Sequence, residues 1–348
     1  MSNPLRLVRQ IGKQYPECWK IVEEFRRQQV AKNKEWPKHC YLPAHIGNQI
    51  VFDNGGIAAW FDKQKNGIMT AEFDRAFADV GRITSLATWR MTQGIYRFDQ
   101  TLYSELLETE VIALPRDVLL KLPEWCVYIE LNNAPSKGVF AHLQFDPADK
   151  SEKLCLTFDT TGNTDGLWTI QLNLIDSLKY EQAEAKKDRE NQTSDSTTEL
   201  LGTQLSGSAG LSGVLSLLLY LCSANADYQE AGAASNSKTR GVVRKKVTAP
   251  KGPTASWNNA PPKQDRRWEV GYRIGPVLRK SIDKPPAQCE STESTGRTVR
   301  PHIRRSHWHH FWKGKRDKKQ LILKWIPPTL VNVDDLDALP MTVRPVRK

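Results

Sequence analysis

The 348-residue sequence lacks the hallmarks of membrane and secreted proteins. Its longest strongly apolar run, residues 210–224, is shorter than the ~20 residues that cross a bilayer, and no charged-then-apolar leader occurs at its start. Six cysteines are scattered without a C-x-x-C pair, which favours free thiols in a reducing compartment over a disulfide framework. We therefore expect a cytoplasmic protein that does not contact a membrane.

Familiar catalytic signatures are missing as well. No Walker loop, G-x-S-x-G, G-x-G-x-x-G or H-E-x-x-H pattern occurs. Neighbouring carboxylates such as Asp334 and Asp335 point in different directions in regular structure, so they make a poor acid–base pair. The sequence thus predicts no catalytic residue, no cofactor and no resident metal. A histidine-dependent ribonuclease stays open, because two histidines and one basic residue are enough for acid–base cleavage of RNA.

Positive charge is concentrated in about a quarter of the chain. Residues 1–237 carry 24 Lys and Arg against 30 Asp and Glu, whereas residues 238–325 carry 23 against 6. The net charge of +11 therefore arises from a segment of +17 attached to a body of −6. Such a segment predicts a polyanionic partner, such as RNA or the ribosome.

Hydrophobic patterning divides the chain into four parts. A mainly helical part is followed by a sheet with a packed helix and an internal polar linker at 181–208, then by a mobile basic loop and a basic C-terminal part rich in His and Trp. The predicted boundaries are 1–110, 111–224, 225–264 and 265–348.

Short runs of β-branched and aromatic residues predict the strands. Four lie in the second part, near 125–131, 139–145, 154–158 and 167–172, and the last part contains two more, 302–312 and 321–326, around a basic turn. We predict an α+β fold with an N-terminal helical part, a central antiparallel sheet, and a C-terminal basic β-hairpin that joins or extends the sheet. Two runs, 122–131 and 87–96, read most simply as core, but at a sheet edge either would accept an extended peptide.

The densest chemical signal is residues 300–312, RPHIRRSHWHHFW, which hold four of the seven histidines. On a strand, His307, His309 and Phe311 would share one face, and Trp308, His310 and Trp312 the other. Same-face histidines supply half of a zinc site, and only Cys289 and Asp317 are conceivable further ligands.

Two other interpretations remain for this segment. It is either an ordinary strand with a solvated basic face, or a surface that binds phosphates and stacks bases. The candidate binding residues are Arg300, Arg304, Arg305, His307, Trp308, His309, His310, Trp312, Lys313, Lys315 and Arg316.

Three stretches together carry a family resemblance: TWRMTQGIY at 88–96, LPEWCVY at 122–128, and RPHIRRSHWHHFW at 300–312 followed by LKWIPP at 323–328. They resemble the second family of type V-A anti-CRISPR proteins, which phages and plasmids carry. The resemblance implies a non-catalytic anti-CRISPR factor that recognises the nascent N-terminal segment of the type V-A effector nuclease and lowers its mRNA during translation. It implies as partners that nascent polypeptide and the ribosome or mRNA. The residues alone leave two alternatives, an RNA-binding or plasmid-maintenance regulator and the ribonuclease.

Overall fold

The computed structural model defines the fold over most of the chain. The residues that it describes are 2–30, 36–51, 71–111, 115–132, 136–147, 150–161, 166–174, 210–231, 261–262, 264–283, 302–314 and 320–331. The predicted linker at 181–208 lies outside them, as does most of the predicted loop at 225–264.

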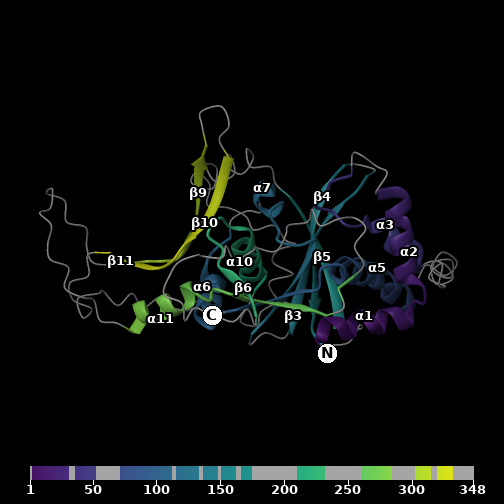
Figure 1. Ribbon diagram of the computed structural model, residues 1–348, viewed down its shortest axis with the longest axis horizontal. Coiled ribbons are helices and arrows are strands. Elements are labelled where there is room, and N and C mark those ends of the chain that lie inside the picture. Colours follow the sequence, from purple (N-terminus) through teal and green to yellow (C-terminus); the bar gives the residue numbers. More distant parts are fainter. Residues whose placement is uncertain are drawn as a thin grey trace, which may run out of the picture.

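A seven-stranded mixed sheet lies at the centre of the protein (Figure 1). Its order is β5 (Leu167–Asn173), β4 (Glu152–Asp159), β3 (Gly138–Phe145), β2 (Cys126–Glu130), β1 (Gly94–Phe98), β7 (Arg266–Val270) and β6 (Tyr228–Glu230). The four predicted strands of the second part are confirmed as the antiparallel series β2 to β5. The sheet is mixed rather than wholly antiparallel, because β1 runs parallel to both of its neighbours.

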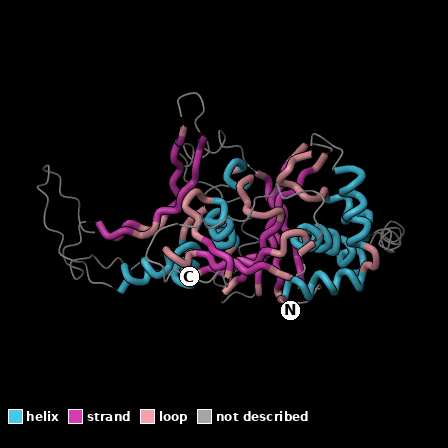
Figure 2. Tube along the Cα trace, viewed as in Figure 1, coloured by secondary structure: helices cyan, strands magenta, loops and turns pink. Residues whose placement is uncertain are grey.

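The strands alternate between two hydrophobic cores, one on each face of the sheet. Along β2, Val127 and Ile129 enter one core, whereas Cys126 and Tyr128 enter the other. This period of two is what a strand buried on both faces requires. Helices accordingly cover both faces of the sheet (Figure 2).

The N-terminal helices cover one face. They are α1 (Asn3–Gln14), α2 (Cys18–Phe25), the π-helical turn η1 (Arg26–Val30), α3 (Ala44–Val51) and α5 (Ala71–Arg90). Ile83, Leu86 and Trp89 of α5 are fully buried at three-residue steps, as the sequence pattern predicted. The predicted helical part also supplies β1, the central strand that the sequence analysis did not identify.

The other face carries α6 (Gln100–Glu108), α7 (Arg116–Leu119) and α10 (Leu211–Cys222). Helix α10 confirms the packed helix predicted at 210–224, and nearly all of its side chains are buried. Helix α11 (Ile274–Asp283) follows β7 and contacts α6. No helix among the described residues is both long and apolar enough to span a membrane.

The C-terminal hairpin forms a sheet of its own. Strands β9 (His307–Lys313) and β10 (Gln320–Ile326) pair antiparallel, and short strands β8 (His302–Arg304) and β11 (Thr329–Val331) make a second small pair beyond them. The predicted α+β class and hairpin are confirmed, but the expectation that the hairpin joins or extends the central sheet is wrong. The outer positions of the central sheet are held by β5 and β6, and the hairpin packs through side chains instead.

All four predicted parts contribute strands to the central sheet. Strand β6 arises from the start of the segment predicted as a mobile loop, where Asp227 is buried and Tyr228 packs against the core. Five cysteines are buried free thiols, as predicted, and Cys289 lies outside the described residues.

Candidate functional site

Trp325 of β10 anchors the hairpin to the body of the protein. Its side chain is fully buried, its indole Nε1 donates a hydrogen bond to Thr109 Oγ1 at 3.1 Å, and its ring meets the ring of Tyr220 edge-on. The amide of Asn225 accepts from the Trp325 main-chain nitrogen at 3.2 Å and donates to its carbonyl oxygen at 2.8 Å. These contacts determine which face of the hairpin turns inward.

The inner face holds two residues of the predicted binding set. Trp308 pairs with Trp325 in the register of the hairpin and packs, partly buried, against the same core. His310 pairs with Leu323, which is also buried. Trp308 and His310 therefore help to seat the hairpin, and the structure does not bring them together with the outward-facing members of the set.

The outer face of β9 carries a row of rings. The ring centroids of His307 and His309 lie 6.4 Å apart, and those of His309 and Phe311 lie 4.5 Å apart. Lys324 lies opposite His309 on β10, and its Nζ is 5.1 Å from the centroid of the Phe311 ring. A cation beside an exposed aromatic ring suits a nucleic acid, because the ring can stack on a base while the cation meets a phosphate.

Both ring nitrogens of His307 are engaged. Nδ1 lies 3.1 Å from the carbonyl oxygen of Arg305, and Nε2 lies 3.3 Å from a guanidinium nitrogen of Arg304. Arginine can only donate, so Nε2 accepts and Nδ1 donates, which fits the neutral imidazole. His307 thereby positions the exposed side chain of Arg304.

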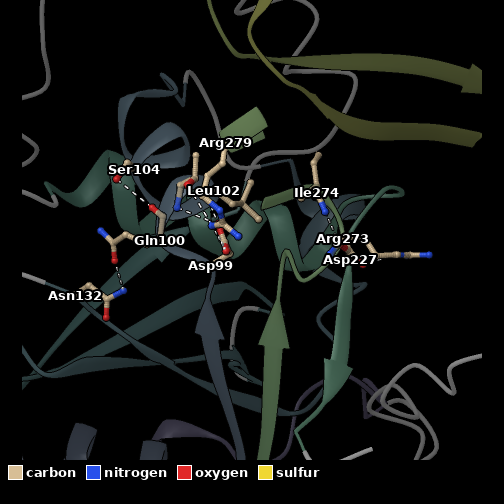
Figure 3. A network of polar contacts seen from close by, with 10 residues as sticks. Asp99, Gln100, Leu102, Ser104, Asn132, Asp227, Arg273, Ile274 and Arg279 are labelled. Carbon is tan, nitrogen blue, oxygen red and sulfur yellow. Dashed lines mark hydrogen bonds and ion pairs between the residues drawn. The ribbon is translucent and has the colours of Figure 1, made fainter. Parts of the chain in front are cut away.

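Arginines earlier in the basic quarter are paired with carboxylates of the folded body. Asp227 accepts from Arg273 Nε at 2.7 Å and from two main-chain nitrogens at the start of α11, so it also caps that helix (Figure 3). Arg279 pairs with Asp99, which caps α6 in the same way (Figure 3). The pairs are Arg266–Glu124, Arg267–Asp265, Arg273–Asp227 and Arg279–Asp99.

The hairpin differs in this respect from residues 264–283. Within the described part of the chain, no ion pair involves its cationic side chains, Arg304, Arg305, Lys313 and Lys324. These four cations are therefore available to a polyanion. We call Arg304, Arg305, His307, His309, Phe311, Lys313 and Lys324 the outer hairpin surface.

Several predicted residues cannot be placed on this surface. Arg300, Lys315 and Arg316 lie outside the described residues, as does the side chain of Trp312. Phe311 and Lys324 were not in the predicted set. The signal for Lys324 was the hairpin register, since pairing Lys313 with Gln320 places it opposite His309.

The structure bears on two alternatives that the sequence left open, a metal site and a strand edge that accepts a peptide. In the described part of the chain, no group of three His, Cys, Asp or Glu side chains is arranged to hold a metal, and Cys289 and Asp317 lie outside that part. The peptide-accepting edge considered at 122–131 is wrong, because β2 is paired on both sides. The same holds for β1 in the run 87–96.

The buried carboxylate of Glu124 joins β7 to the body of the protein through Arg266. Burial raises the pKa of Glu124 to about 7, although Arg266, at 2.7 Å from its Oε1, opposes that shift. Gly94 leaves room for the carboxylate, since a Cβ at that position would overlap it. Glu124 and Arg266 bind each other within the fold, so this cluster holds strands in position.

Comparisons with known proteins bear on the whole chain. Residues 96–333, which include the hairpin, match the family described as "AcrVA2-like: Anti-CRISPR type V subtype A2 family". The chain is 26% identical over 293 residues to Protein FinQ of Escherichia coli, with 75% of this chain and 79% of that protein covered. The crystal structure of AcrVA2 superposes with a TM-score of 0.59 at 21% identity, over 95% of this chain and 100% of that one, which shows a shared fold.

Proposed function

The chain belongs to the anti-CRISPR type V subtype A2 family, and we propose that it recognises the nascent N-terminal segment of the type V-A effector nuclease and lowers the nuclease mRNA during translation. In this proposal it acts in the cytoplasm, its partners are the nascent polypeptide and the ribosome or mRNA, and it contacts no membrane. It needs no catalytic site, cofactor or metal of its own.

The outer hairpin surface is the observation that carries this proposal. It combines cations that have no carboxylate partner among the described residues with an exposed row of His and Phe rings. Phosphate contacts attract a protein to RNA, and ring stacking on unpaired bases holds it there. A protein held on ribosomal RNA or mRNA lies close to the chain being synthesised.

The surroundings of His307 support a non-enzymatic role. A general base needs a nitrogen free to take a proton from the attacking group. In His307, one nitrogen donates to Arg305 and the other accepts from Arg304. Its geometry suits the positioning of a cation for phosphate binding.

A translated reporter tests the proposal. Three versions are compared: the native coding segment for the nuclease N-terminus, a synonymous recoding, and a frameshift that keeps nearly the same RNA. We expect reporter mRNA to fall with the first two and to stay unchanged with the third, because only they encode the peptide. An equal fall with the frameshift would show that RNA sequence, not the nascent chain, is recognised.

A second candidate is an RNA-binding or plasmid-maintenance regulator, which the same cationic and aromatic surface favours. It predicts that a reporter without any nuclease segment falls as much as the native one. The ribonuclease alternative predicts that the purified protein cleaves naked RNA and that His307→Ala or His309→Ala abolishes the cleavage.

A further inference from the structure

Helices α2 and α3, which lie on the side of the central sheet away from the hairpin (Figure 1), line a groove. Its volume is about 810 Å³, and one wall is a single face of α2 and η1, with residues 17, 20, 21, 24, 25 and 28 at helical spacing. The remaining lining comes from α3, Trp36 and Pro147. The volume lies at the upper end of the ~300–1,000 Å³ range typical of ligand pockets, which is enough for a few side chains.

The floor of the groove is apolar and fixed in shape. It consists of Ile21, Phe25, Trp36 and Ile46. The Trp36 indole Nε1 donates to the Cys40 carbonyl at 2.9 Å, and the ring of Phe25 meets that of His45 edge-on at 5.4 Å. The indole nitrogen of Trp36 thus has its hydrogen-bond partner within the fold, and the rings of Phe25 and Trp36 offer apolar surface to the groove.

The rim carries two carboxylates that an incoming cation can engage. Glu17 pairs with Lys20 at 2.9 Å and Glu24 pairs with Arg27 at 2.5 Å, each between exposed side chains three residues apart on the helix. Such surface pairs contribute only about 0–1 kcal/mol, so they exchange readily for a new partner. The same carboxylates repel phosphates, which disfavours a nucleic acid in this groove.

Backbone irregularities flank this wall of the groove. Glu17 adopts a left-handed conformation with φ of 67° at the start of α2, and η1 continues the helix with π-type pairing past Gln28. Both conformations are uncommon and occur often at ligand sites.

We propose that this groove binds the nascent segment itself, through large apolar side chains on the floor and a Lys or Arg at Glu17 and Glu24. This inference rests on the proposed function and assigns its peptide contact to the N-terminal helices. The outer hairpin surface, which lies on the other side of the central sheet from these helices (Figure 1), is left for RNA. An apolar groove between helices with a polar rim is a known mode of peptide recognition.

Filling the groove from its exposed rim tests the inference. Gln28→Trp and Gln49→Trp introduce bulk at exposed lining positions, and Lys13→Trp adds the same side chain at an exposed position of α1 that does not line the groove. The probe is a fluorescent synthetic peptide of the nuclease N-terminal segment, and binding is followed by anisotropy. We expect at least about tenfold weaker binding for both groove variants and less than about twofold change for Lys13→Trp.

Peptide variants test the chemistry, and thermal unfolding checks whether all three variants fold alike. Replacing the large apolar residues of the probe by Ser, or its Lys and Arg by Gln, should weaken binding to the wild type and have a smaller effect on Gln28→Trp. If the peptide binds the wild type and both groove variants equally, or if Lys13→Trp weakens binding as much, the groove is the wrong site while peptide recognition stands. If the peptide does not bind the wild type and the reporter shows no frame dependence, the proposed function fails and the inference with it.

Discussion

Removing two cations from the outer hairpin surface should reduce the salt dependence of RNA binding by a defined amount. Arg304 and Arg305 are exposed, and no carboxylate among the described residues pairs with either of them. Each phosphate contact to a single strand makes the negative slope of log K against log salt steeper by about 0.7. The double variant Arg304→Gln/Arg305→Gln should therefore lower that slope by about 1.4. Between 50 and 200 mM salt, the affinity of the double variant should therefore fall about sevenfold less than that of the wild type.

A matched control separates local from total charge. Arg273→Gln/Arg279→Gln removes the same charge from arginines that pair with Asp227 and Asp99. Affinities for a labelled single-stranded RNA are measured by anisotropy over a potassium chloride series. We expect the control to keep the wild-type slope within about 0.3, because its arginines already have carboxylate partners. A control slope that falls as far as that of the hairpin variant would mean that total charge, not this surface, drives binding, and an unchanged hairpin variant would mean that these arginines contact no phosphate.

Three further predictions concern the anchor, the surface and the buried carboxylate. Trp325→Phe removes the hydrogen bond to Thr109 and part of the buried volume, so thermal unfolding should show a loss of about 2 kcal/mol. Phe311→Ala removes an exposed ring, so single-stranded RNA should bind with about 1–3 kcal/mol less free energy at unchanged stability, whereas equal affinity would exclude stacking on this ring. The raised pKa of Glu124 means that this carboxyl keeps a proton in the folded protein between pH 4.5 and about 7 that the unfolded chain releases, so its own contribution to stability should fall by about 3 kcal/mol as pH rises through this window, relative to a variant without the carboxyl. Glu124→Gln should remove that fall, as measured by the unfolding temperature at pH 5 and pH 7.5.

The sequence predicted the antiparallel strands well because their signal is local. Strands β2 to β5 are short, rich in β-branched and aromatic residues, and separated by turn residues. Strands β1 and β7 pair in parallel across more than 160 residues, from Gly94 to Arg266. No turn signal marks such a pairing, so its register depends on tertiary packing that local patterns do not encode.

The candidate site was predictable to the same limited extent. Strand alternation correctly separated His307, His309 and Phe311 from Trp308 and His310. Which of the two faces is buried depends on Thr109 and Asn225 around Trp325, residues from distant parts of the chain. The full set of predicted residues therefore mixed surface residues with anchoring ones.

Charge counting met a similar limit. The excess over residues 238–325 is a property of the sequence, but its availability to a partner is a property of the fold. Arg273 and Arg279 are used within the body because Asp227 and Asp99 cap the starts of α11 and α6 beside them (Figure 3). A basic segment alone therefore does not define a binding surface: of its described arginines, the four at 266–279 pair with carboxylates, and Arg304 and Arg305 do not.

The groove and the outer hairpin surface are linked, because RNA binding by the hairpin lowers the peptide affinity that the groove needs. A groove with room for a few side chains supports modest affinity for a peptide on its own. A protein already held on the ribosome by its hairpin meets the emerging segment at an effective concentration of up to about 1 mM, which makes modest affinity sufficient. Hairpin variants should then abolish the reporter response while leaving affinity for the isolated peptide unchanged, whereas groove variants should reduce both. A hairpin variant with normal peptide affinity and a normal reporter response would contradict this coupling, because recruitment to RNA would then contribute nothing.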